Sequence, residues 1–277
     1  MEPNFQVLPP IPPEQRPPEP KDSFFKNIGG VIAVGAIALF KYKFLLFGAL
    51  KTGLSMFVMI WVYAWLYGWT FAVGIVLLIF VQEMGHVIAA KLLGMPVTAP
   101  LFIPFIGASI LLKENPRDAW TEALMAYGGP LAGCVGSWIC LLVAQQYEVS
   151  WLMAIASVSF IINLFNMIPV PPLDGGRICA AVSAWFWLIG LVLLGLSVVF
   201  FHAWNSIVII VLVLMAALPR IKQTIFGQSV PEMEAYYQVH PFNRLCMALM
   251  YLGLIAALLL GYWHASDYLS YLSPDDQ

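Results

Sequence analysis

The chain has 277 residues, of which 61% are hydrophobic and 10% are charged, and its mean hydropathy is +0.84. A soluble domain averages about 45–50% apolar and about 25% charged residues, so this composition excludes an ordinary soluble enzyme. The net charge of −2 lacks the excess of Lys and Arg that a nucleic-acid-binding surface needs. The 10 Trp, 11 Tyr and 18 Phe are residue types that suit a bilayer and its interfaces. The sequence predicts a multi-pass integral membrane protein.

The chain divides by composition into two polar ends and an apolar middle. Eight of residues 1–28 are proline, mixed with Glu, Gln and Lys, which favours a solvated, disordered tail. Residues 29–264 carry the apolar blocks and are predicted to form one transmembrane domain, followed by a short polar tail at 265–277. Lys and Arg in the first tail and at 41–51 favour a cytoplasmic N-terminus.

The apolar blocks predict an all-α protein with about six transmembrane helices, each of about 20 residues. Gly128, Gly129 and Gly133 in one block permit close contact with a neighbouring helix. Residues 222–243 form a polar connection before the last block. The blocks are, in chain order, 29–50 (interrupted by two lysines), 53–69, 71–94, 119–146, 151–168, 188–201, 206–218 and 245–263.

Residues 95–112 are apolar but contain Pro96, Pro100, Pro104 and Gly107. Because proline removes a backbone donor and clashes with the preceding helical turn, this segment does not form a regular helix. A non-helical backbone at membrane depth must be covered by protein or water. We therefore expect a membrane-associated hydrophobic loop or β-hairpin here.

Ionisable residues inside the apolar blocks are few. Glu83, Glu122 and Asp174 are the only acidic residues inside or against them, and His86 is the only histidine in the middle of one. Because a charged group is costly in the bilayer, such residues mark candidate functional sites. Glu122 lies close to Trp120, which favours a structural position at a helix end near the interface. The four cysteines show no CxxC spacing, so neither a disulfide nor a cysteine zinc site is predicted.

The run from Gln82 to His86 is close to the zinc-protease pattern His-Glu-x-x-His. In that pattern the two histidines share one helical face and bind one metal, while the glutamate acts as general base. Glu83 and His86 match the pattern, whereas Gln82 stands at the first ligand position. The alternative interpretation is a buried pair of Glu83 and His86 that bridges helices.

A second motif, Asn-Met-Ile-Pro-Val-Pro-Pro-Leu-Asp-Gly-Gly-Arg at 166–177, follows an apolar block. Its three prolines end the helix, and its glycine pair allows a tight turn after Asp174. The turn would hold the Asp174 carboxylate at membrane depth, where it can complete a three-ligand zinc site. The alternatives are that Asp174 caps the next helix and that Asn166 makes an interhelical hydrogen bond.

Together the two motifs resemble the site-2 protease family of intramembrane zinc metalloproteases. The family signature pairs His-Glu-x-Gly-His on one transmembrane helix with Asn-x-x-Pro-x-x-x-Leu-Asp-Gly on another. The resemblance covers roughly residues 53–220 and includes the Gly-Pro-Leu-Ala-Gly run at 129–133 and the proline-rich segment after the first motif. The residues that fit the signature are Glu83, Gly85, His86, Asn166, Pro169, Leu173, Asp174 and Gly175.

The resemblance implies zinc as the cofactor, with His86, Asp174 and Gln82 as metal ligands. It also implies that Glu83 is the general base and that Asn166 hydrogen-bonds the substrate backbone or the oxyanion. The hairpin resembles the family's edge strand, which captures an unwound transmembrane substrate by β-augmentation. The function expected from the resemblance is therefore intramembrane proteolysis, in which transmembrane segments of membrane proteins are cleaved within the bilayer.

Gln82 is the departure from the family pattern. A neutral amide oxygen is a harder donor than imidazole, so we expect a lower zinc affinity than histidine would give. Two other functions use the same residues. A site-2-protease-like protein without hydrolytic activity would bind transmembrane segments, and a transporter would use Glu83, His86 and Asp174 as a proton or metal path. The transporter leaves the second motif unexplained. The sequence does not indicate the substrate, the membrane or the oligomeric state.

Overall fold

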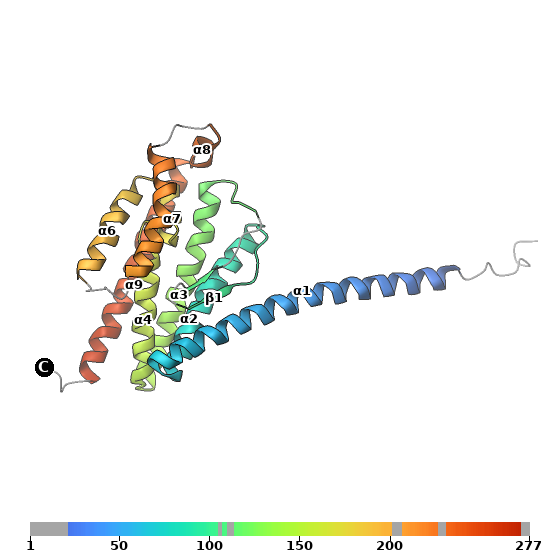
Figure 1. Ribbon diagram of the computed structural model, residues 1–277, viewed down its shortest axis with the longest axis horizontal. Helices are drawn as coiled ribbons and strands as arrows, with labels where there is room; N and C mark the ends of the chain where they lie inside the picture. Colours follow the sequence, from blue (N-terminus) through green and yellow to red (C-terminus); the bar gives the residue numbers. More distant parts are fainter. Residues whose placement is uncertain (1–21, 105–106, 110–113, 201–206, 227–230, 273–277) are drawn as a thin grey trace, which may run out of the picture. The chain divides into compact units, whose positions relative to one another are not determined.

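In the computed structural model the described residues are 22–104, 107–109, 114–200, 207–226 and 231–272. Helices predominate, which confirms the predicted all-α class (Figure 1). The elements are α1 (Asp22–Tyr67), α2 (Trp69–Leu92), β1 (Leu101–Ile103), β2 (Gly107–Ser109), α3 (Ala119–Gln146), α4 (Ser150–Asn166), α5 (Asp174–Val182), α6 (Phe186–Phe200), α7 (Ile207–Phe226), α8 (Pro231–Tyr236) and α9 (Pro241–Leu272).

The chain divides into two compact units, Met1–Phe47 and Gly48–Gln277, and all candidate site residues lie in the second. The predicted tail at 1–28 needs a correction, because α1 begins at Asp22. The last proline of the tail is Pro20, so nothing in the sequence prevents a helix from starting two residues later. The rest of the predicted tail lies outside the described residues.

The predicted polar tail at 265–277 needs a similar correction, because α9 continues to Leu272. Ala265 is buried, and Tyr268 and Leu269 pack against the core. The inner face of α9 thus stays apolar, although polar residues interrupt the apolar sequence of the helix. The remainder of this tail lies outside the described residues.

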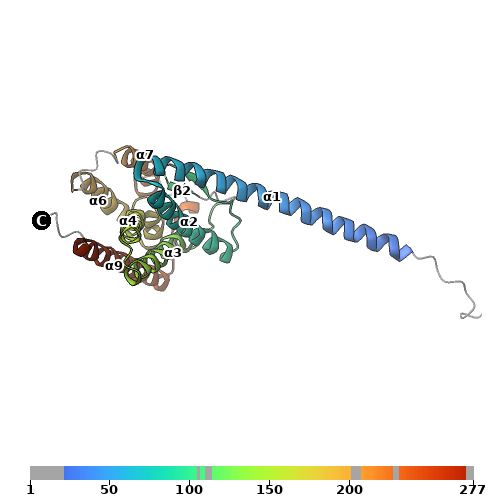
Figure 2. The same ribbon diagram turned by 90° about the horizontal axis from the view of Figure 1, so that it is seen from below.

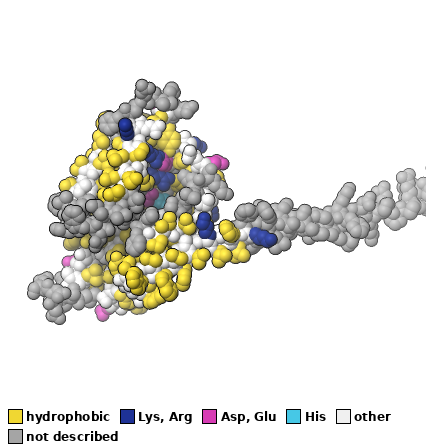
Figure 3. All heavy atoms as spheres, in the orientation of Figure 1, with side chains coloured by type: hydrophobic (Ala, Val, Ile, Leu, Met, Phe, Trp, Pro, Cys, Tyr) yellow, Lys and Arg dark blue, Asp and Glu magenta, His cyan; other side chains and the backbone are white. Residues whose placement is uncertain are grey.

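Four helices among the described residues are long and apolar enough to cross a membrane, namely Leu46–Tyr67, Trp69–Leu92, Ala119–Gln146 and Pro241–Ser270. Two further apolar helices, Ser150–Asn166 and Phe186–Leu196, are shorter. Hydrophobic side chains cover much of the face drawn in Figure 3. These findings agree with a multi-pass integral membrane protein, while the number of about six crossings stays a prediction.

The segment after α2 forms a β-hairpin, which is one of the two structures expected there. β1 and β2 are antiparallel, with Leu101 opposite Ser109 and Ile103 opposite Gly107. Gly107 has a φ of +106°, a conformation that side chains with a Cβ rarely adopt. The prolines that exclude a helix thus leave a short two-stranded sheet.

Two hydroxyl groups of α1 occupy the outer edge of β1. Thr52 Oγ1 donates to the carbonyl oxygen of Pro100 at 2.7 Å. The backbone N–H of Phe102 donates to Ser55 Oγ at 3.2 Å. Side chains of α1 therefore satisfy, on this edge, backbone groups that an added strand would otherwise bind.

α3 lies at the centre of the second unit and packs against α2, α4, α5 and α9, as Figures 1 and 2 show from two sides. Asp118 caps its N-terminus, because Asp118 Oδ1 accepts a hydrogen bond from the backbone N–H of Thr121 at 2.7 Å. The predicted helix at 119–146 is confirmed with the same bounds. Its inner face carries Ala123, Leu141 and other core residues.

Backbone atoms contribute to the contact between α2 and α3 at Gly85 and Gly128. A Cβ added to Gly85 of α2 would overlap the carbonyl oxygen of Gly128. A Cβ added to Gly128 of α3 would in turn lie 2.8 Å from the carbonyl oxygen of Gly85. The small residues thus allow the close helix contact that the sequence predicts.

Candidate metal centre

α2 carries three of the candidate residues on one buried stretch of helix. Gln82, Glu83 and His86 are 4%, 6% and 5% exposed. Because Gln82 and His86 are four residues apart, their side chains lie on the same face of α2. Glu83 lies almost one turn before His86 and is equally shielded. The helix therefore presents an amide, a carboxylate and an imidazole to the interior of the protein.

Asp174 is placed by the proline-rich turn between α4 and α5. α4 ends at Asn166, and α5 begins at Asp174 with Leu173 in the N-cap position. Asp174 is 9% exposed, and its carboxylate is directed at His86 of α2. Of the two roles that the sequence left open for Asp174, this geometry favours participation in the site over helix capping.

Two glycines allow the turn to fold tightly. A Cβ on Gly175 would overlap the backbone of Met167, and a Cβ on Gly176 would overlap the backbone of Val170. The indole N–H of the buried Trp187 donates to the carbonyl oxygen of Gly176 at 2.8 Å. The turn that presents Asp174 is thus held from both sides by close backbone packing and by a buried hydrogen bond.

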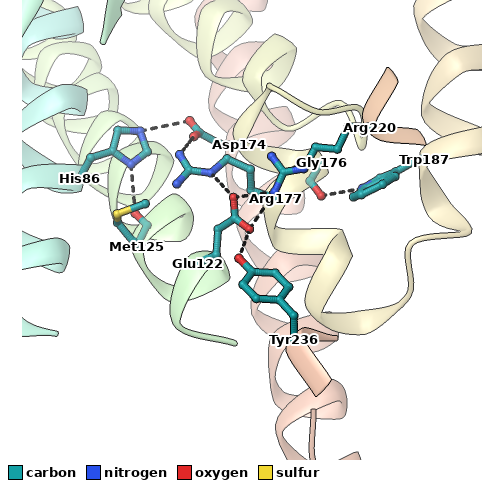
Figure 4. Close-up of polar contacts among 9 residues, drawn as sticks. All are labelled: His86, Glu122, Met125, Asp174, Gly176, Arg177, Trp187, Arg220 and Tyr236. Atoms are coloured by element: carbon teal, nitrogen blue, oxygen red, sulfur yellow. Dashed lines mark hydrogen bonds and ion pairs between the residues drawn. The ribbon is translucent and has the colours of Figure 1, made fainter. Parts of the chain in front are cut away.

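His86 joins α2 to α3 and to α5 (Figure 4). Its Nδ1 lies 3.0 Å from the carbonyl oxygen of Met125, and its Nε2 lies 3.2 Å from Asp174 Oδ2. A carbonyl oxygen only accepts hydrogen bonds, so Nδ1 carries a proton. In a neutral ring Nε2 then presents a lone pair to the carboxylate. Two acceptors facing each other call for a cation or a proton, and an imidazole oriented by a backbone carbonyl is typical of metal sites.

Gly129 of α3 provides the space for this imidazole. A Cβ on Gly129 would overlap the ring of His86, including its Nε2 atom. The first glycine of the Gly-Pro-Leu-Ala-Gly run thus has a structural role, because it leaves space for the imidazole. The ring is enclosed between α2 and α3 with its Nε2 directed at α5.

The donor set fits a zinc ion with two strong ligands and one weak one. His86 and Asp174 supply an imidazole nitrogen and a carboxylate oxygen, which are both common zinc ligands. Gln82, which is buried on the same face of α2, is the candidate for the third donor. Across the described ranges no group of three or more His, Cys, Asp or Glu side chains is placed to hold a metal ion. The metal-ligand roles, and the role of Glu83 as general base, stay predictions.

Asn166 lies at the C-terminal end of α4 and is partly exposed, so its role toward a substrate also stays a prediction. The asparagine buried between α3 and α4 is instead Asn163, which is 1% exposed. Its Nδ2 donates to the carbonyl oxygen of Ser159 at 2.9 Å, and its amide faces Gly133, where a Cβ would overlap it. The structure thus places a buried asparagine one turn before the one that the motif singled out.

A second group of polar side chains lies next to Asp174 and was not predicted. Glu122 Oε1 accepts from Arg177 Nε at 3.2 Å, and both oxygens of Glu122 lie 3.1 Å from Arg220 Nη2. The hydroxyl of Tyr236 donates to Glu122 Oε2 at 2.6 Å. We call Glu122, Arg177, Arg220 and Tyr236 the ionic cluster (Figure 4). Glu122 lies in the first turn of α3, at the helix end that was expected, and it is 4% exposed, so its side chain lies in the interior of the protein.

The ionic cluster joins four helices, because its members come from α3, α5, α7 and α8. Burial, followed by the neighbouring Glu122 carboxylate, raises the pKa of Tyr236, which therefore stays protonated and donates its hydrogen bond. On the face drawn in Figure 3, acidic, basic and histidine side chains gather in one area among hydrophobic ones. The sequence signal for the ionic cluster is weak. Arg177 follows Asp174 by three residues, which places both side chains on one side of a helix.

Helices that can span a membrane, a buried histidine–carboxylate pair and a neighbouring glutamate are the features of a membrane metallopeptidase. The model of peptidase family M50, the site-2 protease family, matches residues 70–150 and 143–187. This match confirms the resemblance that the two motifs carry. Both motifs, Glu122 and Arg177 lie inside the matched ranges, whereas Arg220 and Tyr236 lie beyond them.

A zinc metalloprotease of Methanocaldococcus jannaschii is similar to part of the chain. The two are 29% identical over 109 residues, which are 38% of this chain and 31% of that protein. The chain therefore spans about a third of the length of the curated relative that it matches. This similarity supports a metallopeptidase and implies zinc.

Proposed function

We propose that the protein is an intramembrane zinc metalloendopeptidase that cleaves transmembrane segments of membrane proteins. The observation that carries this proposal is the contact of His86 Nε2 with Asp174 Oδ2 at 3.2 Å, with Glu83 almost one turn away on the same helix. All three side chains are buried, and α2 is long and apolar enough to span a membrane. Ionisable groups are costly inside a membrane, so such an arrangement marks a candidate functional site.

Each residue has a distinct role in this proposal. Zinc, held by His86 and Asp174 with the Gln82 oxygen as a third donor, would supply Lewis-acid activation of water and of the scissile carbonyl. Glu83 takes the proton of the attacking water and passes it to the leaving amine. Asn166, at the end of α4, hydrogen-bonds the substrate backbone or the oxyanion. Burial excludes bulk water, so the proton moves between Glu83 and the reacting groups.

The substrate is a membrane protein segment that must unwind before it is cut. A transmembrane helix keeps its backbone bonded internally, so its peptide bonds are shielded from attack until the helix opens. An opened segment pairs with the hairpin as an added strand. Because Thr52 and Ser55 already occupy backbone groups on the outer edge of β1, we place the substrate strand along β2.

A second candidate function is that of a non-catalytic relative that binds transmembrane segments in the same place. The observation in its favour is Gln82, which offers a harder amide oxygen where the family pattern has an imidazole nitrogen. Without a third strong ligand, the described site holds a cation less firmly than a site with three strong ligands. In this alternative the fold, the hairpin and the turn at Asp174 are kept while hydrolysis is lost.

The test is cleavage of a membrane-spanning reporter by purified protein in liposomes, together with the zinc content of each variant. We expect weak zinc binding and cleavage by the native chain, and more zinc after Gln82→His. Glu83→Gln should lower the cleavage rate by about 10²–10⁴-fold with little change in zinc content. Glu148→Gln, at an exposed position, is the matched control and should leave both unchanged.

Three outcomes decide against parts of the proposal. Cleavage at the native rate by Glu83→Gln removes Glu83 from the mechanism. An inactive native chain with an active Gln82→His variant favours the non-catalytic relative. Absence of zinc from both forms contradicts a metallopeptidase.

A further inference from the structure

The two oxygens of the Asp174 carboxylate face different partners. Oδ2 lies 3.2 Å from His86 Nε2, whereas Oδ1 lies 3.9 Å from Arg177 Nη1. Asp174 and Arg177 are three residues apart in α5, so both side chains project from the same side of the helix. The imidazole and the guanidinium thus lie near different oxygens of the same carboxylate (Figure 4).

Arg177 is itself held by Glu122 of α3. The Nε atom of Arg177 lies 3.2 Å from Glu122 Oε1, and the Arg177 side chain is 20% exposed. A guanidinium presents several N–H donors in a fixed planar fork, so it contacts Glu122 and Asp174 at the same time. Its position relative to α5 is therefore set by a residue of a different helix.

Glu122 is fixed in turn by two further partners. Arg220 of α7 approaches both carboxylate oxygens at 3.1 Å, and the hydroxyl of Tyr236 of α8 lies 2.6 Å from Oε2. Each oxygen of Glu122 therefore accepts two hydrogen bonds. A carboxylate held in this way has little freedom to rotate, and it transmits that constraint to Arg177.

The charges of the group also balance. Two carboxylates, Asp174 and Glu122, lie with two guanidiniums, Arg177 and Arg220, whose charge is permanent. Glu122 carries one negative charge against the two positive charges of Arg177 and Arg220, so it offsets part of the charge of Arg177 and lessens the repulsion of a cation at Asp174. An Arg177 without Glu122 would instead be a free cation next to a proposed metal ligand.

The geometry points to Glu122 and Arg177 as positioning residues of the metal centre. Arg177 attracts Oδ1 of Asp174 while Oδ2 faces His86, and Glu122 holds Arg177 and offsets part of its charge. The metal in this inference is the zinc of the proposed function, and the inference rests on that proposal. The orientation of Asp174 itself does not depend on the metal.

The first test measures metal binding by the full chain, in the native and the Gln82→His backgrounds. Zinc affinity and the visible absorption spectrum of bound Co²⁺ are recorded for Arg177→Gln, Arg177→Lys and Glu122→Gln. Loss of an outer partner of a ligand typically lowers metal affinity about 10–100-fold, and we expect a loss of that size for Arg177→Gln and Glu122→Gln. Their Co²⁺ spectra should change because the geometry of the carboxylate changes.

Conservative and control variants separate positioning from folding. Arg177→Lys keeps the charge but loses the planar fork, so it should restore part of the affinity and it is the milder variant if Arg177→Gln does not fold. Arg244→Gln removes contacts to the backbone carbonyls of Val239 and Tyr237, outside the ionic cluster, and should leave affinity and spectrum unchanged. Parent-like affinities and spectra in all Arg177 and Glu122 variants, with only their thermal stability lowered, would overturn the inference.

The second test needs no metal and therefore separates this inference from the proposed function. Melting temperatures of the metal-free protein are measured for Glu122→Gln, Asp174→Asn and the double variant. If Arg177 links the two carboxylates, the two shifts are non-additive and become additive in an Arg177→Gln background. Additive shifts in the native background refute the link. Protein that binds no metal in either background but shows this coupling refutes the metallopeptidase and keeps the positioning role.

Discussion

Two groups of polar side chains lie beside α3, and their charges are matched in different ways (Figure 4). In the ionic cluster, every oxygen of Glu122 has donors from arginine or tyrosine. Between His86 and Asp174, Nε2 and a carboxylate oxygen lie 3.2 Å apart, and in a neutral ring this nitrogen presents a lone pair. The side chains of the ionic cluster satisfy one another without any ligand. A neutral His86 and the Asp174 carboxylate are instead balanced only by a proton or a cation. The contrast separates a group that is balanced by its own side chains from the pair that forms the candidate metal centre.

The largest expected effect comes from removing the acid of the ionic cluster. Glu122→Ala leaves Arg177 and Arg220 without their carboxylate, and loss of one partner of a buried ion pair typically costs about 3–5 kcal/mol. We expect about 3 kcal/mol, near the lower end, because the Arg220 side chain is 38% exposed. Reversible unfolding in mixed micelles measures this loss. A loss under about 1 kcal/mol, the range of surface pairs, would contradict the complete matching described for this cluster.

The next effect concerns Asp174 in the second group. In a Gln82→His background, Asp174→Asn should lower zinc affinity about 100-fold, which is about 2.7 kcal/mol, because a charged ligand becomes a neutral amide. The effect should be non-additive with His86→Ala, since both changes remove ligands of one site. Titration of the single and double variants with zinc measures both quantities. Unchanged affinity in Asp174→Asn would exclude it as a ligand and leave His86 without its partner.

An intermediate effect is expected where the backbone makes room for His86. Gly129→Ala puts a Cβ into the imidazole ring, and overpacking of this kind typically costs about 1–3 kcal/mol. We expect about 2 kcal/mol of lost unfolding free energy, with a loss of zinc affinity as the ring is displaced. Gly253→Ala in α9 is the control, because nothing lies within 4 Å of its added Cβ. Equal behaviour of the two variants would mean that Gly129 does not shape the site.

The smallest effect is expected for a hydrogen bond between uncharged side chains of α3 and α4. Ser137 Oγ of α3 lies 2.7 Å from Ser159 Oγ of α4 and also donates to the carbonyl oxygen of Gly133. Side-chain hydrogen bonds between transmembrane helices average about 0.6 kcal/mol, so Ser137→Ala should cost less than about 1 kcal/mol and leave zinc affinity unchanged. A loss as large as that of Glu122→Ala would show that charge is not what distinguishes the ionic cluster.

Local patterns predicted those features that depend on residues close in sequence. The bounds of α3 follow from a mainly apolar run at 119–146, and the hairpin follows from the prolines that exclude a helix. The block at 29–50 and all but the last two residues of the block at 53–69 are instead parts of α1, because Lys51 and Thr52 are polar but do not break a helix. The two polar residues therefore led to a predicted helix boundary at 51–52, where the helix is in fact continuous.

The site could be predicted as far as its motifs extend. Glu83, His86 and Asp174 stand in recognisable strings, and the structure brings His86 and Asp174 into contact. The ionic cluster could not be found in this way, because Arg220 and Tyr236 lie 98 and 114 residues from Glu122 in sequence. Arginines near the ends of apolar blocks usually reach the membrane interface, and only the packing of α7 and α8 shows that Arg220 reaches inward.

The glycine contact between α2 and α3 has a consequence for how the site can move. With the backbones of Gly85 and Gly128 touching, no side chain separates the two helices at this level, so a hinge or a sliding motion between them would create a clash or a gap. α2 and α3 therefore move as one body there, carrying Glu83 and His86 with them. The turn before α5 is packed closely as well, since a Cβ on Gly190 of α6 would overlap the backbone of Pro169.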